Sequence, residues 1–479
     1  MDINFWKHLF PGNRSKTVNR NGSERCDLPQ PGVYHFEHNQ AGERSRIHLR
    51  VDGDLISGQG KGILLVNANR VIHLNPTATL MAFLLLQQKT DAEAIQALQK
   101  IYHVSLAQAN SDYAHFRENF NQLIRPDGAC PVCDLDIDIQ APFSTTPTAP
   151  YRMDLALTYR CNNDCEHCYN ARPRDYSEMS NQEWIQIIDR LWEIGIPHVV
   201  FTGGEPTLYA DLPELIAYAE SKGQITGLNT NARRLQDKGF LSKLIDAGLD
   251  HVQFTVESHS AAIHDEMVGA RGAWKQTIAG LRNALDTPLY VMTNTTMLRQ
   301  NSPYLGETLD FLGDIGVPTI GLNALIYAGH GLQVGSGLAE RELPPLLELA
   351  RSKTDHYQQR LIWYTPTQYC HFDPMQLELG VKGCTAALYN MCIEPDGAIL
   401  PCQSYYQPVG NMLSDPWDKI WNHELSLYLR ERKYIPEKCS PCALLAECGG
   451  GCPLALEAQP QALISLDDYA PPNISPHDN

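Results

Sequence analysis

The 479-residue sequence contains no apolar run that approaches the roughly 18 residues of a membrane-spanning helix. Its first residues lack the charged, apolar and small-residue order of a secretory signal. Basic residues are scarce, because 38 Lys and Arg face 55 Asp and Glu, giving a net charge of −17 with no local basic patch. Nucleic acids are bound mainly through their phosphates. We therefore expect a cytoplasmic protein with no membrane contact and no nucleic-acid partner.

Cysteine, by contrast, is plentiful, with 14 in the chain. Cytosolic thiols are kept reduced, so these cysteines predict metal ligands or reactive thiols rather than disulfides. The chain is also longer than the roughly 250–300 residues at which single hydrophobic cores stop growing. We therefore expect several domains, at least one of which binds metal.

The front of the chain predicts a small α+β domain. Two apolar runs, Gly62–Val66 and Val71–Leu74, flank Asn67-Ala-Asn69, a pattern typical of a β-hairpin. Three helices are expected after it. Pro76 can open the first and Thr90 can cap the second, while an aromatic stripe marks the third. A hairpin with three helices predicts a winged-helix-like domain.

Strand-like and helix-like segments alternate through the middle of the chain. The six predicted strands are 153–159, 198–202, 224–229, 250–256, 289–296 and 318–326. The helix between the first two is the clearest, since Ser180 can cap it, Trp184 and Leu191 share one apolar stripe, and Gly195 can end it. Repeated βα units predict an α/β fold, a partial (β/α)6 TIM-like barrel whose reactive groups lie on the loops after the strands.

Three cysteines, Cys161, Cys165 and Cys168, follow the first predicted strand on one short loop. Three thiolates can hold a four-iron (4Fe-4S) cluster and leave one iron open to a small molecule. The alternative is a structural zinc site with His167 as fourth ligand. The loop alone therefore predicts a metal site without fixing the metal.

The second predicted strand ends in Gly203-Gly204-Glu205-Pro206. Together with the cysteine loop and its following Tyr169, this motif resembles the radical S-adenosylmethionine (radical SAM) superfamily. The resemblance implies that the three cysteines hold a four-iron cluster, that the Gly-Gly-Glu-Pro motif binds the amino group of S-adenosylmethionine, and that Tyr169 belongs to the cofactor site. A motif confirmed by its predicted strand-and-loop context favours this interpretation over zinc.

Later strands end in polar residues that fit the same resemblance. Ser258 and Asn294 correspond to positions that contact the cofactor ribose and carboxylate, and Thr255 and Glu257 lie nearby. The alternative is that each only satisfies loop backbone, as polar residues at strand ends commonly do.

A second cysteine-rich region extends from residue 384 to residue 452. Its seven cysteines are Cys384, Cys392, Cys402, Cys439, Cys442, Cys448 and Cys452. They are too many for one four-ligand centre, so two centres are expected, and a pair of zinc ribbons is the alternative to iron. Asp396-Gly397 predicts a hairpin turn, and Gly449–Gly451 allows tight wrapping.

This region resembles the SPASM extension of radical SAM peptide maturases, which implies two auxiliary four-iron clusters. Carried over by position, Cys384, Cys402 and Cys452 hold the first, with Cys392 as fourth ligand. By the same carry-over, Cys439, Cys442 and Cys448 hold the second. The family places a further cysteine downstream for that cluster, and this sequence has none after Cys452. The second cluster is therefore open at one iron, or closed by another group such as Asp467, Asp468, Cys370 or a substrate atom.

Four cysteines remain outside these assignments. Cys370 is a candidate hydrogen-atom donor to a substrate radical, with simple packing as the alternative. Cys130 and Cys133 have a metal-pair spacing, but one pair cannot complete a tetrahedral site, and the only cysteine before them is Cys26. These three receive no role.

The front domain resembles the peptide-recognition domain of ribosomally synthesised peptide pathways, in which a leader peptide adds as a strand to the hairpin edge. The alternative is a packing domain without a ligand. We expect a maturase that cleaves S-adenosylmethionine to a 5′-deoxyadenosyl radical and modifies a precursor peptide, with flavodoxin or ferredoxin as electron donor. The alternatives are a radical enzyme acting on a small molecule such as a tetrapyrrole and, more remotely, a non-catalytic iron-sulfur electron carrier.

These features predict the following organisation. The segments are a flexible arm (1–30), a peptide-recognition domain (31–125), a linker (126–150), the radical SAM partial barrel (151–330), a bridging region (331–369), the SPASM auxiliary domain (370–455) and a tail (456–479).

Overall fold

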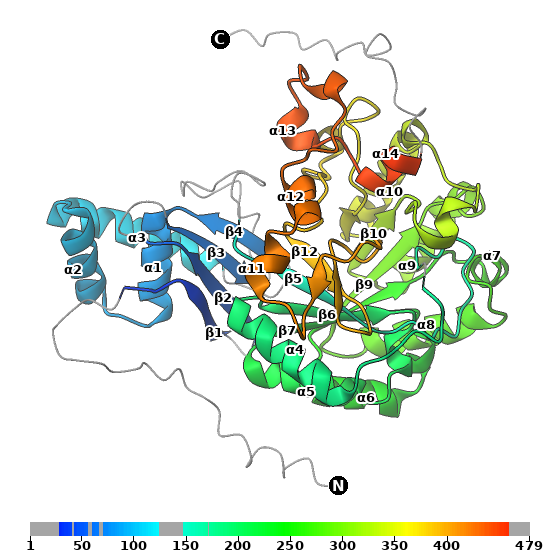
Figure 1. The fold of residues 1–479 in the computed structure, drawn as a ribbon, viewed down its shortest axis with the longest axis horizontal. Coiled ribbons are helices and arrows are strands. Elements are labelled where there is room, and N and C mark those ends of the chain that lie inside the picture. The colour runs from blue at the N-terminus through cyan, green and yellow to red at the C-terminus, as the bar shows by residue number, and fades with distance from the viewer. Residues whose placement is uncertain are drawn as a thin grey trace. The chain divides into compact units, whose positions relative to one another are not determined.

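The computed structural model describes residues 28–40, 43–55, 60–66, 70–123, 147–170 and 172–458. The chain folds into two compact units, one formed mainly by residues 1–141 and the other mainly by residues 142–479. Figure 1 shows the elements of both units. The predicted turn Asn67-Ala-Asn69 lies outside the described residues, as do most of the predicted arm, linker and tail.

The described residues of the N-terminal unit form a four-stranded antiparallel sheet with three helices. Its strands pair in chain order: β1 (Gly32–Gln40), β2 (Glu43–Asp52), β3 (Lys61–Val66) and β4 (Arg70–Leu74). Its helices are α1 (Pro76–Leu86), α2 (Asp91–Tyr102) and α3 (Leu106–Leu123). The predicted hairpin and helices are confirmed, whereas β1 and β2 were not predicted. The period-two alternation of Ile47, His48, Leu49 and Arg50 was the signal for β2.

Helix α1 packs directly on strand β3. The Asn75 side chain accepts the Ala78 N–H at 2.8 Å and caps the helix, and Pro76 occupies its first position. A Cβ at Gly62 of β3 would lie 2.2 Å from Thr79 Oγ1. The close approach of helix and sheet therefore requires glycine at that position.

The second unit is built on a ten-stranded sheet in the order β11-β10-β9-β8-β7-β6-β5-β12-β13-β14. The six predicted strands are confirmed as β5 (Arg152–Thr158), β6 (His198–Gly203), β7 (Ile225–Thr230), β8 (His251–Thr255), β9 (Tyr290–Thr296) and β10 (Thr319–Asn323). All six are parallel, and β11 (Arg360–Trp363) adds a seventh at one edge. The sheet is the partial barrel that the βα pattern predicts.

Helices follow most of these strands. They are α4 (Asn181–Ile194), α5 (Leu212–Lys222), α6 (Lys238–Asp246), α7 (Ala261–Met267), α8 (Ala273–Leu285), α9 (Leu305–Asp314) and α10 (Pro344–His356). Short 3₁₀ helices occupy Pro206–Leu208, Arg233–Gln236, Ser302–Tyr304, Gly329–Leu332, Glu340–Glu342, Pro374–Leu377 and Glu437–Cys439. As predicted, Ser180 caps α4, in a capping box with Glu183, and Gly195 ends it at φ +94°.

The C-terminal segment continues the same sheet. Strand β12 (Asn390–Ile393) pairs in parallel with β5, which sets Cys392 opposite Asp154. The predicted hairpin is confirmed by β12 and β13 (Ala398–Leu400), with Gly397 at φ +85° in its turn, and β14 (Gly410–Asn411) follows. The remaining helices are α11 (Trp417–Trp421), α12 (Glu424–Arg430), α13 (Leu445–Cys448) and α14 (Pro453–Ala458).

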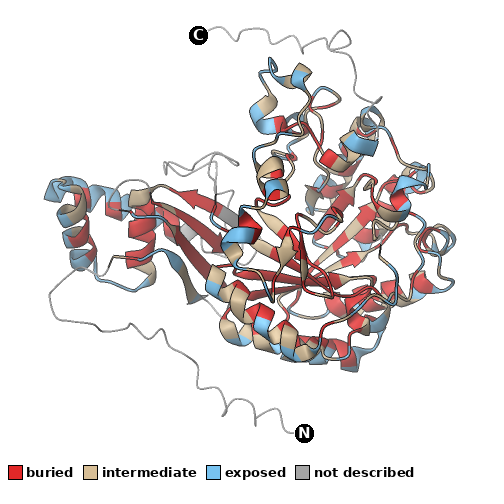
Figure 2. Ribbon diagram, viewed as in Figure 1, coloured by how far each residue is buried: buried red, intermediate tan, exposed pale blue. Residues whose placement is uncertain are grey.

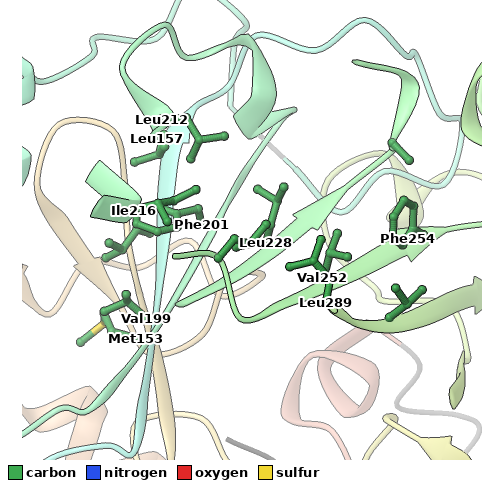
Figure 3. Packing of buried hydrophobic residues seen from close by; sticks show 14 of the residues in the cluster. Met153, Leu157, Val199, Phe201, Leu212, Ile216, Leu228, Val252, Phe254 and Leu289 are labelled. Atoms are coloured by element: carbon green, nitrogen blue, oxygen red, sulfur yellow. The ribbon is translucent and has the colours of Figure 1, made fainter. Parts of the chain in front are cut away.

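The core of this unit lies between the sheet and its helices. On β5, Met153, Leu155 and Leu157 point into this apolar layer, which Figure 3 shows together with β6, β7, β8 and α5. Figure 2 shows the strands of the sheet largely buried and the helices exposed on their outer sides. The alternate residues of β5 face the other way, where Arg152 donates two hydrogen bonds to Asp154, at 2.8 and 3.0 Å. Charged and polar groups thus gather on the inner face of the barrel.

None of the helices in the described parts of the chain is both long enough and apolar enough to cross a bilayer.

Candidate active site and metal centres

The first cysteine loop, residues 161–168, leaves the sheet at the end of β5. Side chains from outside the loop hold its backbone. Arg174 donates to the carbonyl oxygens of Cys161 and Asn163, at 2.6 Å each. Arg233 donates to Asn163 Oδ1 at 2.9 Å and also to the Asn162 carbonyl oxygen. The loop is therefore fixed through its carbonyl oxygens, which leaves the cysteine side chains to other partners.

The three sulfurs of this loop are partly buried and free of disulfides. Burial raises the pKa of Cys161 to about 11, and burial also raises the pKa values of Cys165 and Cys168, with the neighbouring thiols adding to the effect at Cys165. A bare thiolate is thus unfavourable here, and a cationic metal centre would reverse that preference. The Asn163 N–H also points at Cys161 Sγ, at 3.4 Å. Three such sulfurs with a backbone donor fit an iron-sulfur cluster.

His167, the fourth ligand of the zinc alternative, contacts the barrel. Its Nε2 lies 3.1 Å from Glu257 Oε1, and Glu257 also accepts the Thr296 N–H at 2.9 Å. Burial alone would lower the pKa of His167, but the nearby Glu257 carboxylate has the opposite effect, and the net result is a raised pKa. Among the described residues, no group of three or more His, Cys, Asp or Glu is placed to hold a single metal ion.

The glycines of the Gly-Gly-Glu-Pro motif let two strand ends approach each other. A Cβ at Gly203, which has φ +138°, would lie 2.2 Å from the Thr158 carbonyl oxygen. A Cβ at Gly204 would lie 2.5 Å from the Arg160 carbonyl oxygen. The Gly204 N–H donates to the Thr158 carbonyl at 2.7 Å. These glycines therefore set the base of the first cysteine loop, and their predicted contact with the cofactor stays a prediction.

Glu205 is almost fully buried and is bonded within the protein. Its carboxylate accepts from Thr207 Oγ1 and Thr230 Oγ1 at 2.6 Å each, from the Thr207 N–H at 3.1 Å and from the Asn231 N–H at 2.8 Å. Burial raises the pKa of Glu205 despite these four bonds. The Asn231 side chain continues to Asn162 Oδ1 at 2.6 Å. Glu205 thus ties β6 and β7 to the cysteine loop, and Pro206 starts the 3₁₀ helix that follows.

The other predicted cofactor residues differ in their surroundings. Ser258 is fully buried, and its Oγ accepts the Ser260 N–H at 3.1 Å, as the local-turn alternative expects. Asn294 Oδ1 is buried, and the part of the chain that the structure describes offers it no hydrogen-bond partner. A buried amide oxygen without a partner is costly and fits a site that a ligand completes. Tyr169 donates to Gln403 Oε1 at 3.0 Å, next to the auxiliary cysteines.

The first auxiliary group consists of three partly buried cysteines, Cys384, Cys402 and Cys452. Burial raises the pKa of Cys402 to about 12, with Cys452 adding to the effect. Burial also raises the pKa of Cys384, and Cys452 and Cys402 add smaller contributions. Cys392 lies on β12, and burial raises its pKa, followed by the effects of Asp154 and Glu394, with Cys402 contributing less. The predicted fourth ligand is thus near this group but faces the barrel interior.

The second auxiliary group, Cys439, Cys442 and Cys448, lies nearer the surface. Cys442 is exposed, Cys439 is half-buried and Cys448 is buried. The three glycines Gly449–Gly451 that follow all have left-handed φ values, which is the tight wrapping that the sequence predicts. Cys26, Cys130, Cys133, Asp467 and Asp468 lie outside the described residues.

An ion pair that the sequence did not predict joins the segment just after the first cysteine loop to the residue that follows β12. Arg172 donates to both oxygens of Glu394, at 2.6 and 2.8 Å, and Glu394 also accepts from Tyr159 at 3.2 Å. The Glu394 side chain has no exposed surface. Its partner Arg172 is 222 positions away, so sequence spacing gave no signal for the pair.

Known proteins resemble this chain over both the barrel and the C-terminal segment. The radical SAM superfamily model matches residues 155–312, and that of the SPASM iron-sulfur cluster-binding domain matches residues 384–443. The PqqA peptide cyclase of Bradyrhizobium diazoefficiens is 30% identical over 318 residues, which cover 63% of this chain and 81% of the relative. The Fe-coproporphyrin III synthase of Methanosarcina barkeri is 28% identical over 333 residues, covering 63% and 83%.

Among solved structures, Streptococcus suis SuiB bound to precursor peptide SuiA superposes with a TM-score of 0.63. The match covers 83% of this chain and 93% of SuiB at 17% identity, a level that shows the fold alone.

Proposed function

This chain belongs to the radical SAM superfamily and carries the SPASM domain, and on that basis we propose that it matures a ribosomally synthesised precursor peptide. It is an enzyme that binds a four-iron cluster and S-adenosylmethionine, and its SPASM domain binds iron-sulfur clusters. When bound, the cluster and cofactor supply a 5′-deoxyadenosyl radical that abstracts hydrogen from the substrate.

One observation carries the peptide proposal. The fold match with peptide-bound SuiB spans more of this chain than residues 147–458 alone supply, so it extends into the N-terminal unit. Among the strands that the structure describes in that unit, β4 is an outer one. An outer strand offers backbone hydrogen bonds to an extended peptide, a common mode of peptide recognition.

The residues proposed for the active site have distinct tasks. Cys161, Cys165 and Cys168 would hold the first cluster. Glu205 keeps the loop in place through its buried hydrogen bonds, and Asn294 offers an unpaired oxygen to the cofactor. The remaining proposed cofactor-site residues are Tyr169, Gly203, Gly204, Pro206 and Ser258.

The auxiliary cysteines would hold two further four-iron clusters and pass electrons. In this proposal the first auxiliary group takes Cys392 as its fourth ligand. An external donor such as flavodoxin or ferredoxin would supply the electrons. The Tyr169 to Gln403 and Arg172 to Glu394 contacts fix the first cysteine loop relative to this region, which favours electron transfer over a constant distance.

The test is peptide binding by the anaerobically reconstituted enzyme. Fluorescence anisotropy is measured with labelled peptides encoded by the neighbouring reading frames, in the full chain and in a variant lacking residues 1–126. We expect at least one peptide to bind the full chain and to bind the truncated chain at least tenfold more weakly. Release of 5′-deoxyadenosine under dithionite should survive the truncation. An enzyme that cleaves the cofactor but binds none of these peptides contradicts the proposal.

A tetrapyrrole substrate is the second candidate, because the 28% identical Methanosarcina barkeri relative is an Fe-coproporphyrin III synthase. This match covers 63% of the chain, so a tetrapyrrole substrate does not require the N-terminal unit for binding. A visible-absorbance titration with iron coproporphyrin III distinguishes the two candidates. Saturable binding that is unchanged by removal of residues 1–126 would favour the tetrapyrrole.

A further inference from the structure

The loop of residues 367–370 lies directly against the second auxiliary group. The Tyr369 N–H donates to Cys448 Sγ at 3.3 Å, and Cys448 Sγ lies 3.8 Å from the Thr367 carbonyl oxygen. Tyr369 and Cys448 are 79 positions apart in the chain. Backbone N–H groups that point at sulfur are typical surroundings of cluster thiolates. This loop therefore belongs to the immediate environment of the second auxiliary group.

The glycine run after Cys448 makes room for this loop. Gly451 has φ +85°, which a residue with a side chain rarely adopts. A Cβ at Gly451 would lie 2.9 Å from Gln368 Cγ. The left-handed backbone of Gly451 and its lack of a Cβ therefore both allow this glycine run to pack against the 367–370 loop.

The Cys370 sulfur shares the neighbourhood of the cysteine group. Tyr369, whose N–H donates to Cys448 Sγ at 3.3 Å, is the residue directly before Cys370, so a single peptide unit separates Cys370 from this contact. Cys370 Sγ makes one weak contact inside its own loop, to Gln368 Oε1 at 3.9 Å. No strong local bond competes with a metal for this sulfur among the described residues.

We propose that Cys370 supplies the fourth thiolate of the cluster held by the second auxiliary group. The proposal rests on the assignment of an iron-sulfur cluster to that group and not on the identity of the substrate. Coordination releases the thiol proton and leaves the oxidation states of iron and sulfur unchanged. A coordinated sulfur carries no hydrogen atom, so the same residue cannot act as a hydrogen-atom donor to a substrate radical.

The exposure of the site supports a fourth thiolate. Cys370 and Cys442 are both exposed, so an iron left without a protein ligand at this position would face solvent. The three sulfurs of the first cysteine loop are partly buried instead. Residues 453–479 contain no cysteine, whereas Cys370 lies in the described loop whose Thr367 and Tyr369 contact Cys448.

The first test uses the unaltered holoenzyme. Anaerobic alkylation with iodoacetamide is followed by mass spectrometry of the Cys370 peptide, before and after the clusters are removed with a chelator. We expect Cys370 to be labelled at least tenfold more slowly in the holoenzyme, although it is exposed. Equal labelling in the two states would overturn the proposal. This test needs no variant to fold.

The second test compares reconstituted Cys370→Ala, Cys370→Ser and the loop control Gln368→Ala. Iron per chain, the electron paramagnetic resonance (EPR) spectrum and the cluster reduction potentials are measured. For Cys370→Ala we expect up to one iron less per chain, a three-iron signal after oxidation and one altered potential. Cys370→Ser, which keeps an oxygen ligand, should retain the iron with an altered spectrum, and Gln368→Ala should match the unaltered enzyme.

Wild-type iron content, spectrum and potentials in Cys370→Ala would overturn the assignment. These measurements contain neither peptide nor tetrapyrrole. A failure of the substrate proposal and a failure of this inference are therefore distinguishable.

Discussion

The first cysteine loop and the second auxiliary group each present three cysteines in a short segment, but their surroundings differ. Arg174, Arg233 and the His167–Glu257 pair hold the first loop from the barrel side, and its sulfurs are partly buried. The second group lies at the surface, where residues 367–370 pack against it. Both groups therefore lack a fourth thiol within their own segment, but in different surroundings. In our proposals this difference leaves one iron open in the first cluster and closes the second cluster with Cys370.

This difference has a physical basis. A small cofactor needs a site whose walls are set before it binds, because ordering them at that moment reduces affinity. The first loop meets this need, since Glu205 and Asn231 fix it through buried hydrogen bonds. An electron-transfer centre instead needs complete ligation and access for a donor. The exposed second group suits that task.

The largest expected effect is on cofactor cleavage, when Cys161, Cys165 and Cys168 of the first loop are all replaced by alanine. The enzyme should release no 5′-deoxyadenosine under dithionite, because no iron remains to bind the cofactor. Chromatography of the reaction mixture measures the product.

The matching control replaces all three cysteines of the second auxiliary group. We expect iron to be lost from that group while cofactor cleavage stays measurable. Complete loss of cofactor cleavage in both variants would contradict the proposal that the first loop alone binds the cofactor for cleavage.

The ion pair between the two regions gives the next effect. Arg172→Met leaves the fully buried Glu394 without its cation, which should cost about 3–5 kcal/mol of unfolding free energy. The midpoint of urea unfolding measures the loss. In the control Arg299→Met, the exposed pair with Glu342 is lost, and less than about 1 kcal/mol is expected. Equal losses in both variants would show that Arg172 is not a buried link.

A smaller effect is expected from Gly204→Ala at the base of the first loop. The new Cβ would lie 2.5 Å from the Arg160 carbonyl oxygen, and we expect a loss of about 1–3 kcal/mol together with weaker cofactor binding. Calorimetric titration with S-adenosylmethionine and thermal unfolding measure both. The control Gly306→Ala in α9 meets only Leu349, at 3.7 Å, and should be neutral or slightly stabilising. An unchanged Gly204→Ala variant would contradict the close strand contact.

The smallest effect lies outside both cysteine regions. Ser180→Ala removes the cap of α4, where Ser180 Oγ accepts the Glu183 N–H at 3.4 Å. We expect a loss of about 1 kcal/mol in thermal unfolding, with cofactor cleavage and EPR spectra unchanged. An altered cluster spectrum would mean that α4 positions the first loop more directly than its contacts indicate.

Much of this architecture was predictable because its signals are local. The six barrel strands, the ends of α4 at Ser180 and Gly195, and the turn at Gly397 follow from periodicity, capping and left-handed glycine conformations. Strand β2 also carries a local signal, its period-two alternation, but it was not predicted. The described part of the N-terminal unit therefore has four strands where only a hairpin was expected. The Arg172–Glu394 pair had no local signal, because its partners meet only after β12 has joined β5.

The sequence by itself determined the repeated βα units, the cysteine spacings and the Gly-Gly-Glu-Pro motif, because each depends on residues a few positions apart. Only the tertiary structure decided that Gly203 and Gly204 pack on the backbone at the end of β5 and just after it, that Glu205 is hydrogen-bonded within the protein, and that the loop of Cys370 packs against Cys448. The Glu205–Thr230 and Tyr369–Cys448 contacts, for example, join residues 25 and 79 positions apart, and folding alone brings such residues together.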